Sequence, residues 1–505
     1  MADGNLDSDI PVYSHQQILR VITGVMLCIF LASLDQTVII PAVPAMAAEL
    51  NAFGHLSWIV TAYLLTSTAA LPIISKLSDI WGRRALLLPC LAVFIVASLG
   101  CGFAQTLPQL IVARAIQGLG GAGLMSMAQA SIADVVAPRE RGRYQGYMAS
   151  MWGVSSIAGP TVGGWATDHL SWRWIFWVNL PIGLIAMVLC DRALRIVRRQ
   201  PREVRIDYLG AALIVAGVTS LLLMLSWGGV ELPWSSAPVI LLGVGGVALL
   251  GALAWQERRA IDPVLPPRLF ADKTFLCGVL IAFFTSLGLF GATFLLPLYF
   301  QLVLGFEAEQ SGLLVMPFLA ASVIGAYVGG QFARRIGRTK GLVVAGLIGT
   351  SLGFAGLALG ASGGRLALVL AFSALLGLGT GVTMPAVLMQ VQNAAERRDV
   401  GAATGSLLFL RSMGGAFGST IVGSVLVAKF NAGLAAAGLP AIDLGMLHGG
   451  AMTGGLVQAR AALASGFQLA LAVCFALMLV AVAIAAAMRD LPLRSGVAPS
   501  REIAH

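Results

Sequence analysis

Charged residues are scarce in this sequence, at 11% of 505 residues, whereas an ordinary soluble protein carries about 25%. Hydrophobic residues make up 58% of the chain. So few charges cannot cover the surface of a soluble fold of this length, and the composition excludes a soluble enzyme, a disordered chain and a fibrous protein. The net charge of +9 therefore does not indicate a nucleic-acid partner. The remaining fold class is an all-α polytopic membrane protein within a lipid bilayer.

Residues that bind metals and phosphates are also few. The six cysteines lie in or at the edges of apolar runs without metal-ligand spacing, so we expect no disulfide and no metal site. The five histidines lie outside the apolar runs, which argues against a membrane enzyme with His, Asp and Glu gathered at one depth. None of the four lysines belongs to a phosphate-binding loop, so ATP-driven pumping is excluded and no cofactor is expected.

Apolar runs long enough to cross a bilayer recur along the whole chain, since a spanning helix needs about 20 such residues. We place fourteen spans near residues 18–40, 56–76, 85–103, 108–130, 144–165, 174–190, 208–227, 238–255, 274–298, 311–332, 341–360, 366–390, 402–427 and 464–488. An even number puts both termini on one side of the membrane. With the N-terminus in the cytoplasm, 26 of the 32 basic residues fall in the inner segments, as the positive-inside rule requires.

The last six spans repeat the first six. A shift of 259 residues places the Gly-Leu-Gly of residues 118–120 on the Gly-Leu-Gly of residues 377–379, and Gly159 on Gly418. Two six-helix repeats are typical of transporters that work by alternating access around a central site. The predicted parts are a cytoplasmic N-tail (1–17), an N-terminal bundle (18–190), a linker with two further helices (191–273), a C-terminal bundle (274–488) and a cytoplasmic C-tail (489–505).

Asp35 is the only acid well inside a predicted span. Burial disfavours its charged form, whereas a nearby arginine would favour it, and the two effects together would allow a proton to bind and leave. Arg114 lies inside the fourth span, where an arginine without a partner is costly. Asp35 and Arg114 are therefore candidates for proton coupling, and the alternative is a permanent structural ion pair.

Residues 75–84, between the second and third spans, are a candidate for controlling access from one side. Gly82 suits a tight reversal between helices, and Arg83 favours the cytoplasmic side. Asp79 can contact a helix N-terminus or a basic group of the other half, and such a contact would hold that side shut. The alternative is a charged loop that only sets the topology.

Residues 153–164 in the fifth span combine glycine with proline. Pro160 removes a backbone donor, and Gly159 loosens the turn before it. Together with Gly163 and Gly164, they predict a bendable, closely packed helix end whose role is conformational. Packing alone is the alternative.

These motifs, in their order along the chain, resemble the major facilitator superfamily and, more narrowly, its fourteen-span drug:proton antiporters. The resemblance covers about residues 18–490, and the segments that carry it are 34–37, 114–123, 159–164, 172–183 and 409–418. Five residues depart from the family pattern, and Ile40, Ser75 and Ser155 replace Asn, Gly and Gly, respectively. Pro41 is additional and is expected to interrupt the first span, and Ile80 stands where the loop motif usually carries arginine.

The resemblance implies proton-coupled export of amphipathic or lipophilic compounds by alternating access, which is multidrug efflux of the kind that confers antibiotic resistance. Asp35 would bind the proton, and Arg114 would modulate that binding. Residues proposed for the substrate cavity are Gln36, Tyr63, Gln117, Trp152, Phe294, Tyr299, Met316 and Arg411. Arg411, near the midplane of the thirteenth span, either binds an anionic group or donates to helix carbonyls.

A carrier of the same fold for one specific metabolite, lipid or siderophore is the alternative function. The excess of arginine over lysine, 28 to 4, is typical of GC-rich bacteria and predicts a bacterial cell membrane. The outer segment 429–463 is rich in Gly and Ala, and we consider it the place where a periplasmic adaptor would bind.

Overall fold

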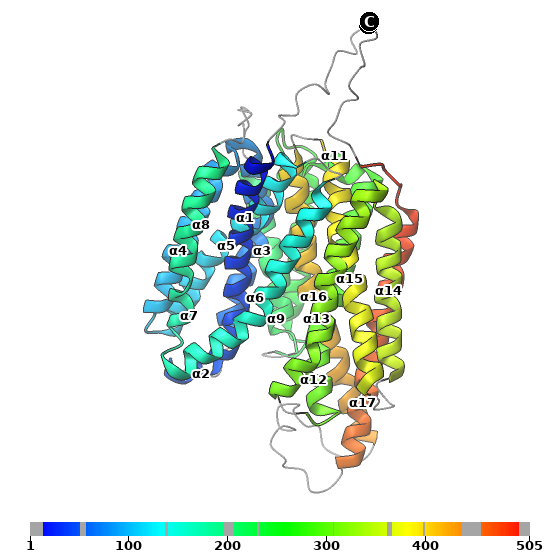
Figure 1. Cartoon of the computed structure of the whole chain (residues 1–505). Coiled ribbons are helices and arrows are strands. Elements are labelled where there is room, and N and C mark those ends of the chain that lie inside the picture. Colours follow the sequence, from blue (N-terminus) through cyan, green and yellow to red (C-terminus); the bar gives the residue numbers. More distant parts are fainter. Residues whose placement is uncertain are drawn as a thin grey trace, which may run out of the picture.

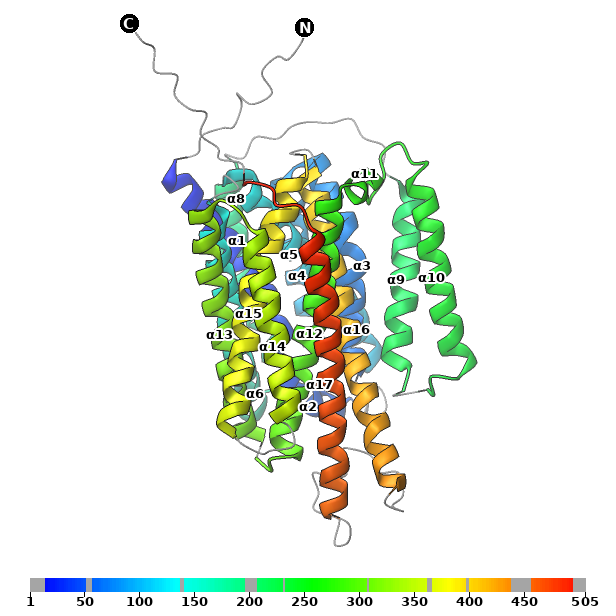
Figure 2. The same cartoon turned by 90° about the vertical axis from the view of Figure 1, so that its right-hand side faces the viewer.

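A computed structural model gives the arrangement of the chain, and the description below covers residues 14–50, 57–136, 140–195, 207–229, 232–306, 308–360, 366–396, 399–436 and 456–493. Within these ranges almost every residue is helical, and the long helices run side by side in one bundle (Figure 1). The start of the first helix and the end of the last lie at the same end of the bundle, which we call the inner end (Figure 2).

The first half of the molecule contains six spans. They are α1 (His15–Val38), α3 (Ser57–Trp81), α4 (Arg83–Phe103), α5 (Leu107–Val135), α6 (Arg141–His169) and the consecutive α7 (Trp174–Trp177) and α8 (Asn179–Leu194). A 3-10 turn (Ile40–Ala42) and the short α2 (Val43–Glu49) follow α1. The interruption therefore occurs at Pro41, where the sequence predicts it, because proline cannot donate to the preceding turn.

The second half repeats this plan. Its spans are α12 (Lys273–Leu302), α13 (Ala308–Ile336), α14 (Lys340–Gly360), α15 (Leu366–Ala394), α16 (Val400–Ala436) and α17 (Leu456–Ala487). Between the halves lie α9 (Tyr208–Trp227), α10 (Ala237–Glu257) and the short α11 (Pro267–Ala271). The pair α9 and α10 stands at the edge of the bundle, where α9 contacts α3 and α16 (Figure 2).

Thirteen of the described helices are long and apolar enough to cross a membrane. The predicted span at 144–165 corresponds to α6, which has 29 residues but is less apolar than the others. The reason is its position, because α6 packs against α1 of its own half and against α13 of the other half. A helix enclosed by protein on both sides needs fewer lipid-facing residues. The all-α polytopic fold expected from the sequence is confirmed.

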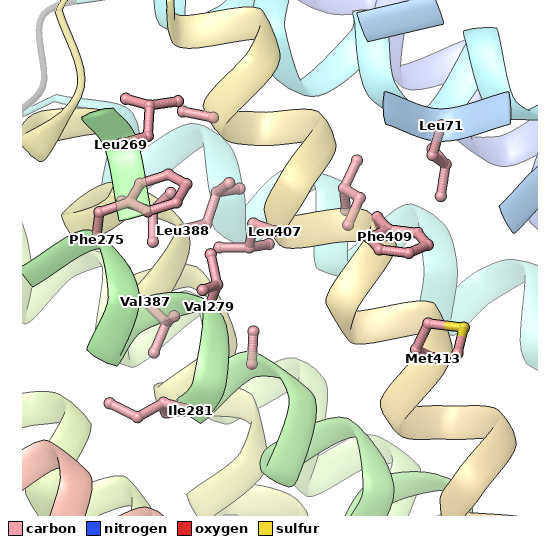
Figure 3. Packing of buried hydrophobic residues seen from close by; sticks show 14 of the residues in the cluster. Leu71, Leu269, Phe275, Val279, Ile281, Val387, Leu388, Leu407, Phe409 and Met413 are labelled. Atoms are coloured by element: carbon pink, nitrogen blue, oxygen red, sulfur yellow. The ribbon is translucent and has the colours of Figure 1, made fainter. Parts of the chain in front are cut away.

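The two halves share one apolar core near the inner end. Leu71 of α3 belongs to the same buried cluster as Leu407 and Phe409 of α16 and Val279 of α12 (Figure 3). Glycines bring the halves closer still, because a Cβ on Gly330 of α13 would lie 2.6 Å from the carbonyl carbon of Gly142 on α6. Such small-residue contacts let helices pack where lipid supplies no hydrophobic drive for association.

Candidate functional site

A buried ion pair joins α1 and α5. Arg114 donates from Nη1 to Oδ2 of Asp35 at 2.7 Å, and each side chain is only 1% exposed. The helix brings Arg114 to this depth because α5 carries glycines on the faces toward α3 and α4. A Cβ on Gly118 would lie 2.5 Å from the carbonyl oxygen of Tyr63, and one on Gly120 would lie 2.7 Å from that of Cys90. The glycines of the 114–123 motif therefore set the helix spacing that the ion pair needs.

Two amides complete the shell around the Asp35 carboxylate. Gln117 and Asn179 donate to its Oδ1 at 2.8 and 2.9 Å. Both amides also donate to Oγ of Ser98, which in turn donates to the carbonyl of Phe176. All partners of the carboxylate are donors, which is the pattern that an ionised carboxylate accepts. The network ties four helices, α1, α4, α5 and α8, to one acidic group.

The guanidinium of Arg114 is equally enclosed. Its Nε donates to the carbonyl of Ile59 at 3.2 Å, and its Nη1 also donates to Gln117 at 2.7 Å. The Tyr63 ring lies 4.5 Å from the guanidinium carbon, close enough for a cation–π contact. Within the described residues, the charged pair is therefore fully partnered and sealed from solvent.

A cavity of about 450 Å³ lies between the halves, next to this network. Its walls come from α1, α3, α5 and α6 on one side, from α12, α13, α15 and α16 on the other, and from α9. Leucine is the most frequent lining residue, accompanied by three methionines and three aromatic side chains, and the polar lining includes ten serine and threonine hydroxyls and three glutamine amides. Such a lining suits lipophilic molecules of varied shape. Tyr63 joins the two parts of the site, because it lines the cavity and also contacts Arg114.

Four of the residues proposed for the cavity, Gln36, Tyr63, Trp152 and Arg411, line it. The other four are not among the lining residues. Gln117 is fully buried in the network around Asp35, and Met316 of α13 is half-buried. The roles of all eight in transport stay predictions.

The two remaining positions show why helix periodicity alone misplaces cavity residues. On α12 the lining ends at Phe290, and Phe294 lies one turn farther out with 40% of its surface exposed. Tyr299 faces α17 instead, where its ring meets that of Phe467 at 5.5 Å. The face of α12 that lines the cavity and the length of the cavity along this helix both depend on the neighbouring helices.

The loop motif connects the two halves at the inner end. Asp79 accepts from the backbone N–H groups of Gly401 and Ala402 at 3.0 and 2.7 Å, at the N-terminus of α16. Arg83 holds that carboxylate at 2.8 Å and also bonds Asp134 of α5 at 2.8 Å. Asp79 therefore contacts the other half at the kind of partner that the sequence suggested, a helix N-terminus with free N–H groups.

Gly82 makes the geometry of this turn available. Its φ of 89° lies in the left-handed region, which favours glycine. The reversal allows α4 to start at Arg83 directly after α3 ends at Trp81. A second contact between the halves also lies at the inner end, where Arg334 of α13 contacts Glu140 at 3.4 Å. The gating roles of Asp79, Gly82 and Arg83 stay predictions.

The glycine and proline motif of α6 packs against α1. Thr37 donates to the carbonyl of Ser155 at 2.9 Å, and a Cβ on Gly159 would lie 2.6 Å from that of Thr37. A Cβ on Gly163 would meet the carbonyl of Val38, whereas one on Gly164 would meet nothing within 4 Å. Pro160 lies inside the helix between these contacts. Gly159 and Gly163 thus lie at the α1 interface, whereas Pro160 is exposed and Gly164 has open space beside it.

Sequence reasoning missed two members of the network, Asn179 and Ser98. Asn179 begins α8 at full burial, and a lone amide inside an apolar run was the available signal. Ser98 gave no signal, because small hydroxyl residues are common in packed membrane helices. Among the described residues, no three His, Cys, Asp or Glu side chains are grouped to hold a metal ion.

Comparison with known proteins gives matches across the chain. The description "Major Facilitator Superfamily" belongs to the family profile that matches residues 25–419. Multidrug transporter protein MdtP of Bacillus subtilis is 36% identical over 410 residues, which cover 81% of this chain and 75% of that protein. Efflux pump FUS6 of Gibberella moniliformis is 33% identical over 421 residues, covering 81% and 74%. The structure of the proton:xylose symporter XylE superposes with a TM-score of 0.61 at 14% identity, covering 93% of this chain and 96% of that one, and shows the same fold.

Proposed function

The chain belongs to the major facilitator superfamily, and from that premise we propose that it is a proton-coupled antiporter that exports amphipathic or lipophilic compounds. It is a membrane transporter rather than an enzyme. Relatives named as a multidrug transporter and an efflux pump, at 36% and 33% identity, support export as the direction. The observation that carries proton coupling is the sealed Asp35–Arg114 pair beside the cavity.

The proton step begins at the enclosed carboxylate. In the present arrangement Asp35 accepts from three donors, one of them the guanidinium of Arg114. We propose that a proton replaces Arg114 as the charged partner of this carboxylate when the helix packing changes. The Asp35–Arg114 pair would therefore couple proton binding to the conformation of the first half.

The substrate step takes place on the other side of Tyr63. This ring forms part of the cavity wall and rests on the Arg114 guanidinium. Gln36 lines the cavity while its neighbour Asp35 faces the network, so one turn of α1 touches both sites. Displacement of Tyr63 or α1 by a bound compound would disturb the ion pair, and this shared wall is the proposed coupling route.

Alternating access requires that the inner end open and close. The described contacts between Asp79 and the α16 N-terminus, and between Gly142 and Gly330, hold it closed here. In the exporting cycle, this end opens to admit a compound from the cytoplasm, and a proton from outside returns through Asp35. A cell membrane is the proposed location.

The test is transport by the purified chain in proteoliposomes loaded with a lipophilic dye. We expect dye movement that depends on an imposed pH gradient and is matched by proton flux in the opposite direction. Liposomes without protein provide the control for leakage. Dye movement that ignores the gradient, or proton flux in the same direction as the substrate, would contradict antiport. Uptake of a single metabolite, lipid or siderophore would favour the alternative carrier.

A further inference from the structure

The cavity has an unusual charge inventory. Of the charged side chains in the described residues, only Arg411 lines its wall, and no acidic side chain does. A cavity with one cation and no acid repels cationic compounds and favours an anionic group. The group that balances the charge of Arg411 would define the substrate class, and this inference rests on the proposed function, in which the cavity is the substrate site.

Arg411 points to the cavity because of its place on α16. The lining positions on this helix are Leu407, Leu408, Arg411, Ser412, Gly415, Ala416, Ser419 and Thr420. They recur every four residues and so form one face of the helix. Arg411 lies in the middle of that face, and its neighbours one turn away are apolar or small.

The guanidinium has no protein acceptor in the described part of the chain, where no hydrogen bond or ion pair to Arg411 is found. The acids inside the bundle are engaged elsewhere: Asp35 with Arg114, Asp79 with Arg83, and Asp399 with Arg268. An arginine within the membrane normally pairs with an acid or with carbonyls, because a bare charge there is costly. The partner of Arg411 is therefore to be sought in what the cavity binds.

We propose that the cavity recognises compounds with an acidic group, and that Arg411 binds this group while the apolar wall holds the rest of the molecule. The planar fork of a guanidinium matches carboxylate and sulfonate oxygens with two parallel hydrogen bonds. Trp152, Met148 and Leu289 line the same cavity and offer apolar contact for an aromatic body. The substrate class is thus amphipathic organic acids rather than lipophilic cations.

Two probes that share one aromatic frame test this assignment. 1-Anilinonaphthalene-8-sulfonate carries a sulfonate, and N-phenyl-1-naphthylamine lacks it. Fluorescence titration of each with the full chain in lipid nanodiscs measures binding, with empty nanodiscs as the blank. We expect the sulfonate to bind the wild-type chain at least about tenfold more tightly than the neutral amine, the size expected for a charge-assisted hydrogen bond.

Variants assign the preference to one side chain. Arg411→Met should remove the preference for the sulfonate, Arg411→Lys should keep most of it, and neither should change binding of the neutral amine, which also reports folding. Arg259→Met is the matched control, because Arg259 contacts the Trp255 ring and does not line the cavity. Equal binding of both probes by the wild type, or an unchanged preference in Arg411→Met, would overturn the proposal. These measurements use no gradient, so a failure of proton antiport would leave their result standing.

Discussion

At the scale of single residues, the site depends on one carboxylate with three donors and on one arginine with three acceptors and two aromatic rings around it. Asp35 and Arg114 are each 1% exposed, and in such surroundings a charged group left without its partner is far more costly than a lost pair at the surface. At each of these positions, a substitution that removes the charge should therefore be compared with one that keeps it.

Asp35→Asn keeps the shape of the side chain and removes its ability to bind and release a proton. We expect gradient-driven dye efflux in proteoliposomes to fall to the level of protein-free liposomes. Asp168→Asn, at an exposed position near the outer end of α6, is the matched control and should transport normally. Full efflux by Asp35→Asn at normal protein levels would refute the coupling role.

Arg114→Ala removes the charged partner of the Asp35 carboxylate. We expect the pH optimum of transport to differ from that of the wild type, with the optimum of Arg114→Lys closer to it. Transport rates over a pH series measure this. An unchanged optimum would show that the two side chains do not communicate.

The sequence predicts this pair well but its surroundings poorly. An acid and an arginine that lie in apolar runs of the same half are each costly to bury alone, so the cost of burial favours their pairing. The contribution of Ser98 depends on how closely α4 approaches α5, and the exclusion of Gln117 from the cavity depends on which face of α5 turns to α1. Such angles arise from the packing of several helices at once.

At the scale of helices, the glycines of α6 allow this helix to pack closely against two others. Gly159 and Gly163 bring it against α1, which carries Asp35, and Gly142 brings its inner end against α13. One helix therefore contacts both the helix of the proton site and the opposite half. Because closely packed helices cannot accommodate added volume, a single methyl group at these positions should lower the stability of the protein.

Gly159→Ala and Gly164→Ala differ only in what the new methyl group meets. At Gly159 it would be 2.6 Å from Thr37 Cβ, and at Gly164 it would meet nothing within 4 Å. We expect the first to lose about 1–3 kcal/mol of stability and most transport, and the second to stay within about 0.5 kcal/mol of the wild type. Thermal unfolding in detergent and dye efflux measure both. Equal stability of the two variants would contradict the packing role.

Helix positions were predictable because hydrophobic length determines a membrane span, and the basic loops fix the order of sides. The ends of the helices were less predictable than their positions. The predicted span 402–427 begins close to the start of α16 at Val400 but stops well before its end at Ala436. Lys429 and Asn431 end the apolar run there, but neither residue ends a helix, and the extension packs against α17. Much of the outer segment 429–463 proposed for an adaptor lies outside the described residues.

At the scale of the molecule, the described contacts between α6 and α13, and between α3 and α16, gather at the inner end. Such a closed inner end with a central cavity is one of the two states that alternating access requires. Transport must break these contacts once in every cycle.

A reversible cross-link across the halves should stop that cycle. Glu140 and Arg334 face each other at 3.4 Å at the inner end, so Glu140→Cys with Arg334→Cys places two thiols within reach of a short methanethiosulfonate linker. We expect the linker to abolish efflux and a reducing agent to restore it. The variants with only one of the two substitutions are the controls for modification of the native thiols, of which Cys277 is only partly buried. Undiminished efflux in the linked protein would show that the inner end does not open.

The contact between Asp79 and α16 also limits how the protein can vary. One lobe contributes an acidic side chain, whereas the other contributes main-chain amides that any residue except proline would supply. A substitution of Asp79 therefore removes the contact directly, whereas a substitution of Ala402 leaves the N–H donor in place. The space beside Gly401 is nonetheless filled by Arg83, whose Nη1 would lie 2.5 Å from an added Cβ. Selection should therefore preserve an acidic side chain at position 79 in the first half and a small residue at position 401 in the second half.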